Sequence, residues 1–314
     1  MRKWTPLTFV VNLVQAFVLT LIGILSVFVP RRFRSKSVTG EVALVTGAGS
    51  GIGRLMAILL AREGCHVICW DVNRKGNDET VAAIQRLKGQ AHGFVVDVTK
   101  REMVYEMAAK IPEVTEGREV TILINNAGIV IGEHLENASD EKIKLLMDVN
   151  TVSHFWTVKA FLPGMTRAKK GHIITIASSA GLIAATDRMV PYFTSKFAAV
   201  GFDEALYLEL QFTNRSYIKT TVVCPFFINT GMFDGAASIL PILEPGYVAE
   251  QVIAAMKANE EVLILPGWVW IFPIIKALVP RKVSRALCRA FAFDEGMSNF
   301  RGRNPAESAD KKST

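Results

Sequence analysis

The chain has 314 residues, of which 50% are hydrophobic and 21% are charged. This hydrophobic content is enough for the core of one large α/β domain with appendages, and it excludes a disordered chain. Its net charge of +7 is concentrated at the two ends: six basic residues precede the first acid, Glu41, and from Arg281 onward eight basic residues face four acids, which leaves residues 41–280 at −3. Because the basic surplus flanks apolar segments instead of an interleaved basic and aromatic patch, we expect no nucleic acid partner and favour an anionic membrane surface.

Residues 1–36 are predicted to form a membrane anchor with basic flanks. Residues 7–29 contain no charge and, as a helix, would reach roughly 34 Å, compared with about 30 Å of bilayer hydrocarbon. Basic residues follow where a signal peptide would have a cleavage site, so we expect no cleavage. More basic residues follow the apolar run than precede it, which places the body of the protein on the cytosolic side. Whether the helix spans the bilayer or lies in one leaflet stays open, because three polar residues form a stripe along it: Thr8, Asn12 and Gln15.

The four cysteines are scattered and include no CxxC pair of the metal-binding or redox kind. We therefore predict no metal site, and a body that faces a reducing compartment.

Residues 37–280 alternate short β-branched runs with helical patterns. This alternation predicts an α/β fold, a Rossmann-type doubly wound parallel sheet of about seven strands with helices on both faces. The predicted strands are 42–46, 66–71, 93–98, 121–124, 172–177, 218–224 and 261–265. The long irregular stretch after the sixth strand is expected to be functional, as lids often are.

The first predicted strand leads into a glycine-rich turn and then directly into a helical pattern. Glycine lets the backbone lie against a pyrophosphate, whose charge is met by unpaired N–H groups at the start of the helix. The turn residues expected to hold a dinucleotide are Gly47, Ser50, Gly51, Ile52 and Gly53.

Acidic residues end the next two predicted strands. Asp71 can accept hydrogen bonds from an adenosine ribose and would repel a 2′-phosphate, which favours NAD over NADP. Arg54 and Arg74 lie nearby and keep NADP possible. Asp97 and Val98 are placed to hydrogen-bond adenine, with a plain turn as the alternative.

Three motifs occur in a fixed order: TGxxxGIG at Thr46–Gly53, NNAG at Asn125–Gly128 and YxxxK at Tyr192–Lys196. In this order and spacing they resemble the short-chain dehydrogenase/reductase family over roughly residues 41–266. The resemblance implies an oxidoreductase that dimerises through helices including the YxxxK segment. It also implies that Lys196 holds the nicotinamide ribose and that three further residues border the cofactor: Asn126, Ala127 and Gly128.

Tyr192 and Lys196 carry the expected chemistry. Four apart on one helix, they share a face. A tyrosine has a pKa of about 10, and a cation about 4 Å away at an effective dielectric near 20 favours the phenolate by up to roughly 4 kcal/mol. We therefore expect Lys196 to make Tyr192 a usable base near neutral pH, taking the alcohol proton in oxidation and returning it in reduction.

Two neighbouring serines are candidates for the role of orienting the substrate oxygen. The usual family gap counted back from Tyr192 gives Ser179, whereas counting from the preceding strand and the following glycine gives Ser178. We choose Ser178, because the strand holds a residue rigidly while the loop after it can absorb an insertion. Asn150 matches the family asparagine that holds a water in a proton relay to the lysine, and a mid-helix Asn is otherwise unfavourable.

Residues 225–230 resemble the family segment PGxVxT. Ile228 and Thr230 would then meet the nicotinamide carboxamide. Phe226 replaces the usual glycine, a departure expected to stiffen or shift this turn.

The C-terminal part, residues 262–314, is apolar at first and then basic. Prolines interrupt its apolar run and make it a poor membrane span. Trp268, Trp270 and Phe272, followed by basic residues, suggest a second surface-docking element near the active-site mouth, with packed core helices as the alternative. Residues 281–314 are predicted to be a basic amphipathic segment that ends in a disordered polar tail.

The anchor and the segments at 70–73, 196–202 and 230–233 look like the membrane-bound branch that contains retinol dehydrogenases and lipid-droplet hydroxysteroid dehydrogenases. The resemblance implies an NAD-dependent oxidoreductase for a lipophilic alcohol or carbonyl, such as a retinoid, a steroid or a long-chain alcohol, at the endoplasmic reticulum or at lipid droplets. Apolar residues of the expected lid suit a lipid tail. The alternatives are an NADPH-dependent carbonyl or 3-ketoacyl reductase and a droplet-surface scaffold protein.

Overall fold

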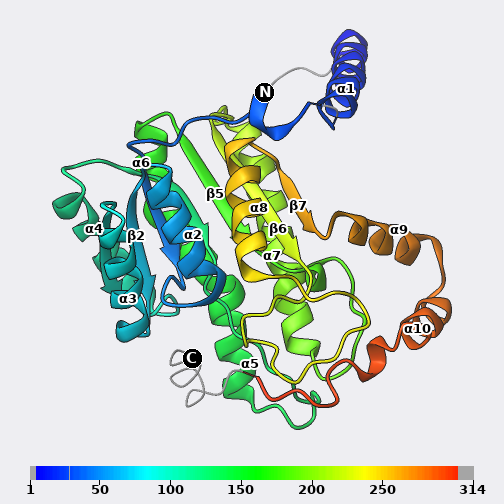
Figure 1. Cartoon of the computed structure of the whole chain (residues 1–314). Coiled ribbons are helices and arrows are strands. Elements are labelled where there is room, and N and C mark those ends of the chain that lie inside the picture. Colours follow the sequence, from blue (N-terminus) through cyan, green and yellow to red (C-terminus); the bar gives the residue numbers. More distant parts are fainter. Residues whose placement is uncertain (1–4, 28, 303–314) are drawn as a thin grey trace.

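The computed structural model describes residues 5–27 and 29–302. At its centre lies a seven-stranded parallel sheet in the order β3-β2-β1-β4-β5-β6-β7 (Figure 1). The Rossmann-type sheet predicted from the sequence is confirmed. Because the order of growth reverses between β1 and β4, a crevice opens there at the carboxyl ends of the strands. The strands are β1 (Val42–Thr46), β2 (His66–Asp71), β3 (Gln90–Val95), β4 (Val120–Asn125), β5 (Gly171–Ile176), β6 (Ile218–Pro225) and β7 (Val262–Leu265).

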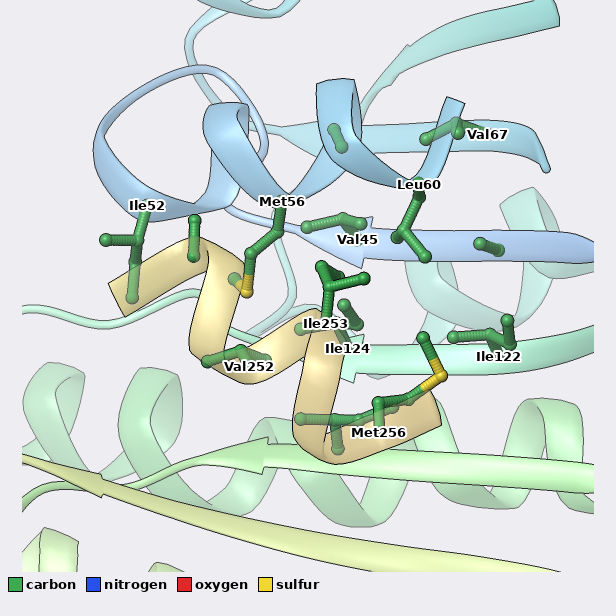
Figure 2. Packing of buried hydrophobic residues seen from close by; sticks show 14 of the residues in the cluster. Val45, Ile52, Met56, Leu60, Val67, Ile122, Ile124, Val252, Ile253 and Met256 are labelled. Atoms are coloured by element: carbon green, nitrogen blue, oxygen red, sulfur yellow. The ribbon is translucent and has the colours of Figure 1, made fainter. Parts of the chain in front are cut away.

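Helices cover both faces of the sheet. On one face lie α2 (Gly51–Arg62), α3 (Arg74–Arg86) and α8 (Pro245–Lys257); on the other lie α4 (Arg101–Val114), α6 (Ser153–Arg167) and α7 (Val190–Phe212). Figure 2 shows Met56 and Leu60 of α2 and Ile253 of α8 packed in front of the strands. Leu60 is fully buried, so its replacement by alanine would cost roughly 2–5 kcal/mol.

The third strand differs from its predicted range. It begins at Gln90 instead of residue 93 and ends at Val95, before Asp97. As the edge strand it is only half buried and mixes polar with apolar residues, so no continuous apolar run marks its start. Asp97 consequently lies in the following loop, where its carboxylate accepts hydrogen bonds from the N–H and hydroxyl of Thr99, at 3.0 and 2.7 Å.

Helix α1 (Pro6–Val27) projects away from the body of the molecule (Figure 1). Large apolar side chains along it are exposed, Leu7 and Phe17 among them. Within residues 5–27 and 29–302, no helix has the length and hydropathy of a membrane-crossing segment. The anchor predicted from the sequence stays a prediction.

The basic linker after α1 is bound to the edge of the sheet where the strands begin. Arg31 makes a bidentate contact with Glu260, at 2.8 and 2.7 Å, and Arg34 reaches the same carboxylate at 3.4 Å. The ammonium of Lys36 lies 2.9 Å from Nδ1 of the buried His172. Three of the four basic residues that follow α1 therefore bind partners within the chain instead of a lipid surface.

Beyond β7 the chain forms two short helices, α9 (Ile271–Leu278) and α10 (Arg281–Ala290). It then returns beneath the irregular segment 226–244, which we call the lid (Figure 1). The disordered tail predicted from the sequence falls largely on residues 303–314, outside the described residues.

Candidate active site

The glycine-rich turn between β1 and α2 adopts a backbone that needs glycine. Gly47 and Gly51 have φ values of 67° and 54°, a region that side chains disfavour. A Cβ on Gly53 would stand 2.1 Å from the Gly47 carbonyl oxygen. The turn therefore fits close against the start of α2, a geometry that suits a pyrophosphate held by backbone N–H groups.

The NNAG segment is tied to this turn. The hydroxyl of Thr46 accepts hydrogen bonds from the backbone N–H groups of Asn126 and Ala127, at 2.9 and 3.0 Å, and the Asn126 amide donates to the Thr46 carbonyl at 2.9 Å. On the other side, Asp71 accepts hydrogen bonds from the N–H groups of Gly49 and Asn73, both at 2.8 Å. The ends of β1, β2 and β4 thus form one continuous wall.

A cavity of about 410 Å³ opens over this wall. It brings together every predicted site residue except Asn150. The predicted residues that line it are Gly47, Ser50, Gly51, Ile52, Gly53, Asp71, Asp97, Val98, Asn126, Ala127, Gly128, Ser178, Tyr192, Lys196, Ile228 and Thr230.

Tyr192 and Lys196 lie near the start of α7 and are almost fully buried. The Lys196 ammonium stands 5.7 Å from the centroid of the Tyr192 ring and donates to the Ile176 carbonyl at 3.0 Å. Burial lowers the pKa of Lys196 to about 8.

Burial also raises the pKa of Tyr192 to about 12, and a hydrogen bond with Ser178 lowers it in part. This shift runs opposite to the expectation that Lys196 makes Tyr192 a base near neutral pH, which stays a prediction. The loss of hydration dominates, since the buried phenolate has little solvent, and the ammonium is held by a carbonyl of β5. A raised pKa favours the neutral phenol, the form that donates a proton.

The two serines have different surroundings, although both line the cavity. Ser178 accepts a hydrogen bond from the Ala180 N–H at 3.1 Å and is hydrogen-bonded to Tyr192. Ser179 is buried at the start of a short turn, Ser179–Gly181. Of the two serines, Ser178 is the one whose hydrogen bond lowers the pKa of Tyr192.

Asn150 lies behind the cavity in a π-helical turn, Asp148–Val152, which joins α5 (Asp140–Met147) to α6. Its amide oxygen accepts from the Ile129 N–H at 2.8 Å, and its nitrogen donates to the Ile129 carbonyl at 2.9 Å and to Ser195 at 3.1 Å. In this arrangement Asn150 positions the loop after β4 and the first turns of α7.

The half of the cavity away from the glycine turn is apolar and aromatic. Phe226, which replaces the usual glycine, packs edge-to-face on Phe227 with ring centroids 4.9 Å apart. Met232 and Phe233 of the expected apolar lid line this half. Residues that the sequence analysis did not place in the site also line it: Ile183, Met189, Phe193, Val269, Phe293 and Gly296. No local motif marks them, since the fold collects them from the loop between β5 and α7, from α7 itself and from the C-terminal part.

The sequence model of the family described as short chain dehydrogenase matches residues 41–238. The chain belongs to the short chain dehydrogenase family. It is 40% identical over 270 residues to epidermal retinol dehydrogenase 2 of Homo sapiens, with 84% of this chain and 86% of that protein covered. It is 40% identical over 266 residues to estradiol 17-beta-dehydrogenase 11 of Mus musculus, with 84% and 88% covered.

Among solved structures, a short chain dehydrogenase/reductase from Burkholderia phymatum in complex with NAD has the same fold. The TM-score is 0.71 at 24% identity, over 77% of this chain and 95% of the other. Family membership agrees with the ordered motifs. In the described parts of this short chain dehydrogenase, no group of three or more His, Cys, Asp or Glu residues is arranged to hold a metal ion.

Proposed function

We propose that this protein is an NAD-linked oxidoreductase that interconverts a lipophilic alcohol, such as a retinoid, a steroid or a long-chain alcohol, and its carbonyl. One observation carries the proposal: a single cavity joins the glycine-turn cradle, the Tyr192 and Ser178 pair, and an aromatic compartment. Relatives named as retinol and estradiol dehydrogenases support the substrate class.

The cofactor would be held by the glycine turn, with Asp71 on its adenosine ribose and Lys196 on its nicotinamide ribose. When bound, the nicotinamide supplies the hydride acceptor in oxidation and the hydride donor in reduction. Ser178 would donate a hydrogen bond to the substrate oxygen. Tyr192 would exchange the proton with that same oxygen, giving it up as the carbonyl becomes an alcohol and taking it back in the reverse direction.

The test is a panel of lipid alcohols and their carbonyls assayed with NAD, NADH, NADP and NADPH on the full-length chain in membranes. We expect turnover with the NAD couple and its loss in Tyr192→Phe, which keeps the ring but removes the exchangeable proton. Equal rates for wild type and Tyr192→Phe would overturn the mechanism, and a clear NADPH preference would favour the carbonyl reductase alternative. A cellular effect that survives Tyr192→Phe would favour a scaffold role.

We also propose that the protein is attached to the endoplasmic reticulum membrane or to lipid droplets, as a homodimer with its catalytic domain facing the cytosol. Exposed apolar residues of α1 support the attachment, as do Trp268 and Trp270, which are half exposed next to cavity-lining Phe272. Basic residues follow on α10, where Arg281 and Arg285 suit anionic lipid headgroups.

Flotation of the full chain with vesicles tests this attachment. We expect binding to phosphatidylserine-containing vesicles to exceed binding to neutral ones, and the excess to fall in Arg281→Gln/Arg285→Gln. A Trp268→Ala/Trp270→Ala variant should weaken binding to both vesicle types. Unchanged flotation in both variants would restrict attachment to α1. Sedimentation in detergent tests the dimer.

A further inference from the structure

The cavity is completed by residues beyond the family match. That match ends at residue 238, yet the aromatic half of the cavity includes Phe272, Phe293 and Gly296. From Gly296 the chain runs back along the lid (Figure 1). We call residues 296–302 the strap.

The strap is hydrogen-bonded to the lid along its length. The Gly296 carbonyl accepts from the Ala237 N–H at 2.8 Å, and the Asp234 carbonyl accepts from the N–H groups of Arg301 and Gly302, at 2.9 and 3.1 Å. Gly235, with φ of 81°, faces the strap so closely that a Cβ there would stand 2.0 Å from the Asn299 carbonyl oxygen. The lid backbone is therefore shaped to receive the strap.

Side chains of the strap continue inward to Tyr192. Phe300 lies against Gly132, where a Cβ would stand 2.1 Å from the ring, and its centroid is 6.5 Å from that of Phe233. Phe233 meets Tyr192 edge-to-face, with centroids 5.6 Å apart and an interplanar angle of 83°. Met297, fully buried, belongs to the same apolar cluster. A chain of ring contacts thus links the strap to the phenol.

We propose that Phe300 is a positioning residue that holds Phe233 against Tyr192 and so closes the lid over a bound lipid alcohol. The lipid alcohol in this inference rests on the proposed function, whereas the contacts of Phe300 with Gly132 and Phe233 do not depend on it. Phe233 also packs on Phe227, with ring centroids 4.9 Å apart, so its ring contacts both the Tyr192 phenol and Phe227. Without Phe300, the outer side of Phe233 would lose its packing partner, and the lid could move away from the cavity.

The experiment compares Phe300→Ala with Phe300→Leu and with Leu87→Ala, a control at a half-exposed site after α3 on the far edge of the sheet. Three readouts are measured on the full-length chain: hydrogen exchange, NAD affinity, and kcat and KM with a lipid alcohol. In Phe300→Ala we expect faster exchange of amides at 231–243, unchanged protection of the sheet, and NAD affinity equal to that of the control. We expect kcat/KM to fall by about tenfold to a hundredfold, chiefly through KM, with partial recovery in Phe300→Leu.

Unchanged lid exchange, or a kcat/KM equal to that of Leu87→Ala, would overturn the role of Phe300. Should Phe300→Ala lose sheet protection as well, Gly132→Ala becomes the deciding variant, because it displaces the Phe300 ring without removing it. If the wild-type chain oxidises no lipid alcohol, the proposed function fails, while the exchange data still decide whether the strap holds the lid.

Discussion

Arg54 forms an ion pair with Glu79 at 3.0 Å, and the same guanidinium nitrogen donates to the carbonyls of Gly49 and Gly76, at 2.6 and 3.0 Å. Its Nε donates to Thr80. Arg54 was one of two basic residues near the glycine turn that kept NADP possible. Because its Nη2 and Nε donors are occupied within the fold, they compete poorly for a 2′-phosphate, which strengthens the case for NAD.

The first prediction concerns cofactor choice. Asp71→Ser should lower kcat/KM with NAD by roughly tenfold to a hundredfold, since a hydrogen bond to a charged group contributes about 1.5–3 kcal/mol. Adding Glu79→Gln should raise kcat/KM with NADP above that of the single variant, because Arg54 loses its ionic partner. Steady-state kinetics with both cofactors check this. An Asp71→Ser enzyme with wild-type NAD kinetics would contradict it.

The second prediction separates the neighbouring serines. Ser178→Ala should lower kcat by about 10²–10³, comparable to the loss of one preorganised donor at a developing oxyanion. Ser179→Ala should have a smaller effect, since the structure pairs Ser178 with Tyr192. Parallel kinetics of the two variants, with circular dichroism to verify folding, decide between them. The reverse order of effects would reassign the serine.

The parallel sheet and the glycine turn could be predicted because each depends on local sequence. Buried parallel strands such as β1 give continuous apolar runs, and the turn needs glycine at fixed positions. The edge strand β3 was misplaced because it is only half buried.

The aromatic half of the site could not be predicted in the same way. Phe233 and Phe300 come together only because the lid and the strap fold over the same edge, and no periodic pattern reports such a contact. The rise in the pKa of Tyr192 could not be predicted for a related reason. Helical spacing gives the distance to Lys196, whereas the dominant influence is burial by elements distant in the sequence.

The third prediction follows from the raised pKa of Tyr192. With a pKa of about 12, the phenol is mostly protonated at neutral pH, ready to donate to a carbonyl, and only a small fraction is the phenolate that accepts the alcohol proton. Alcohol oxidation should therefore accelerate as pH rises from 6 to 9, while carbonyl reduction should not. Initial rates in both directions at saturating cofactor test this. An oxidation rate that is flat across the range would show that the phenol titrates lower in the working enzyme.

The fourth prediction concerns the linker after α1. Glu260→Gln removes the charge that binds Arg31 and Arg34, both of them partly exposed. The loss should be modest, about 1 kcal/mol, and should show as roughly fivefold faster trypsin cleavage in the linker. Glu209→Gln, which breaks the exposed pair with Arg215, is the control. Equal cleavage rates in the two variants would mean that the Glu260 contacts do not hold the linker.

The last prediction concerns Asp203 on α7, a buried carboxyl near Thr175, Thr220 and Glu261. Burial raises its pKa from 3.8 to about 7, so the folded chain holds a proton there that the unfolded chain releases. Below pH 3.8 both states hold the proton, and the carboxyl does not penalise folding. As pH rises from 3.8 towards 7 only the unfolded chain releases it, so the free energy of unfolding falls by up to roughly 4 kcal/mol at 1.36 kcal/mol per pKa unit. Asp203→Asn lacks the titration, so its melting temperature should rise relative to wild type between pH 4 and pH 8. A difference in melting temperature that stays constant across this range would show that the Asp203 carboxyl is ionised throughout in the folded chain.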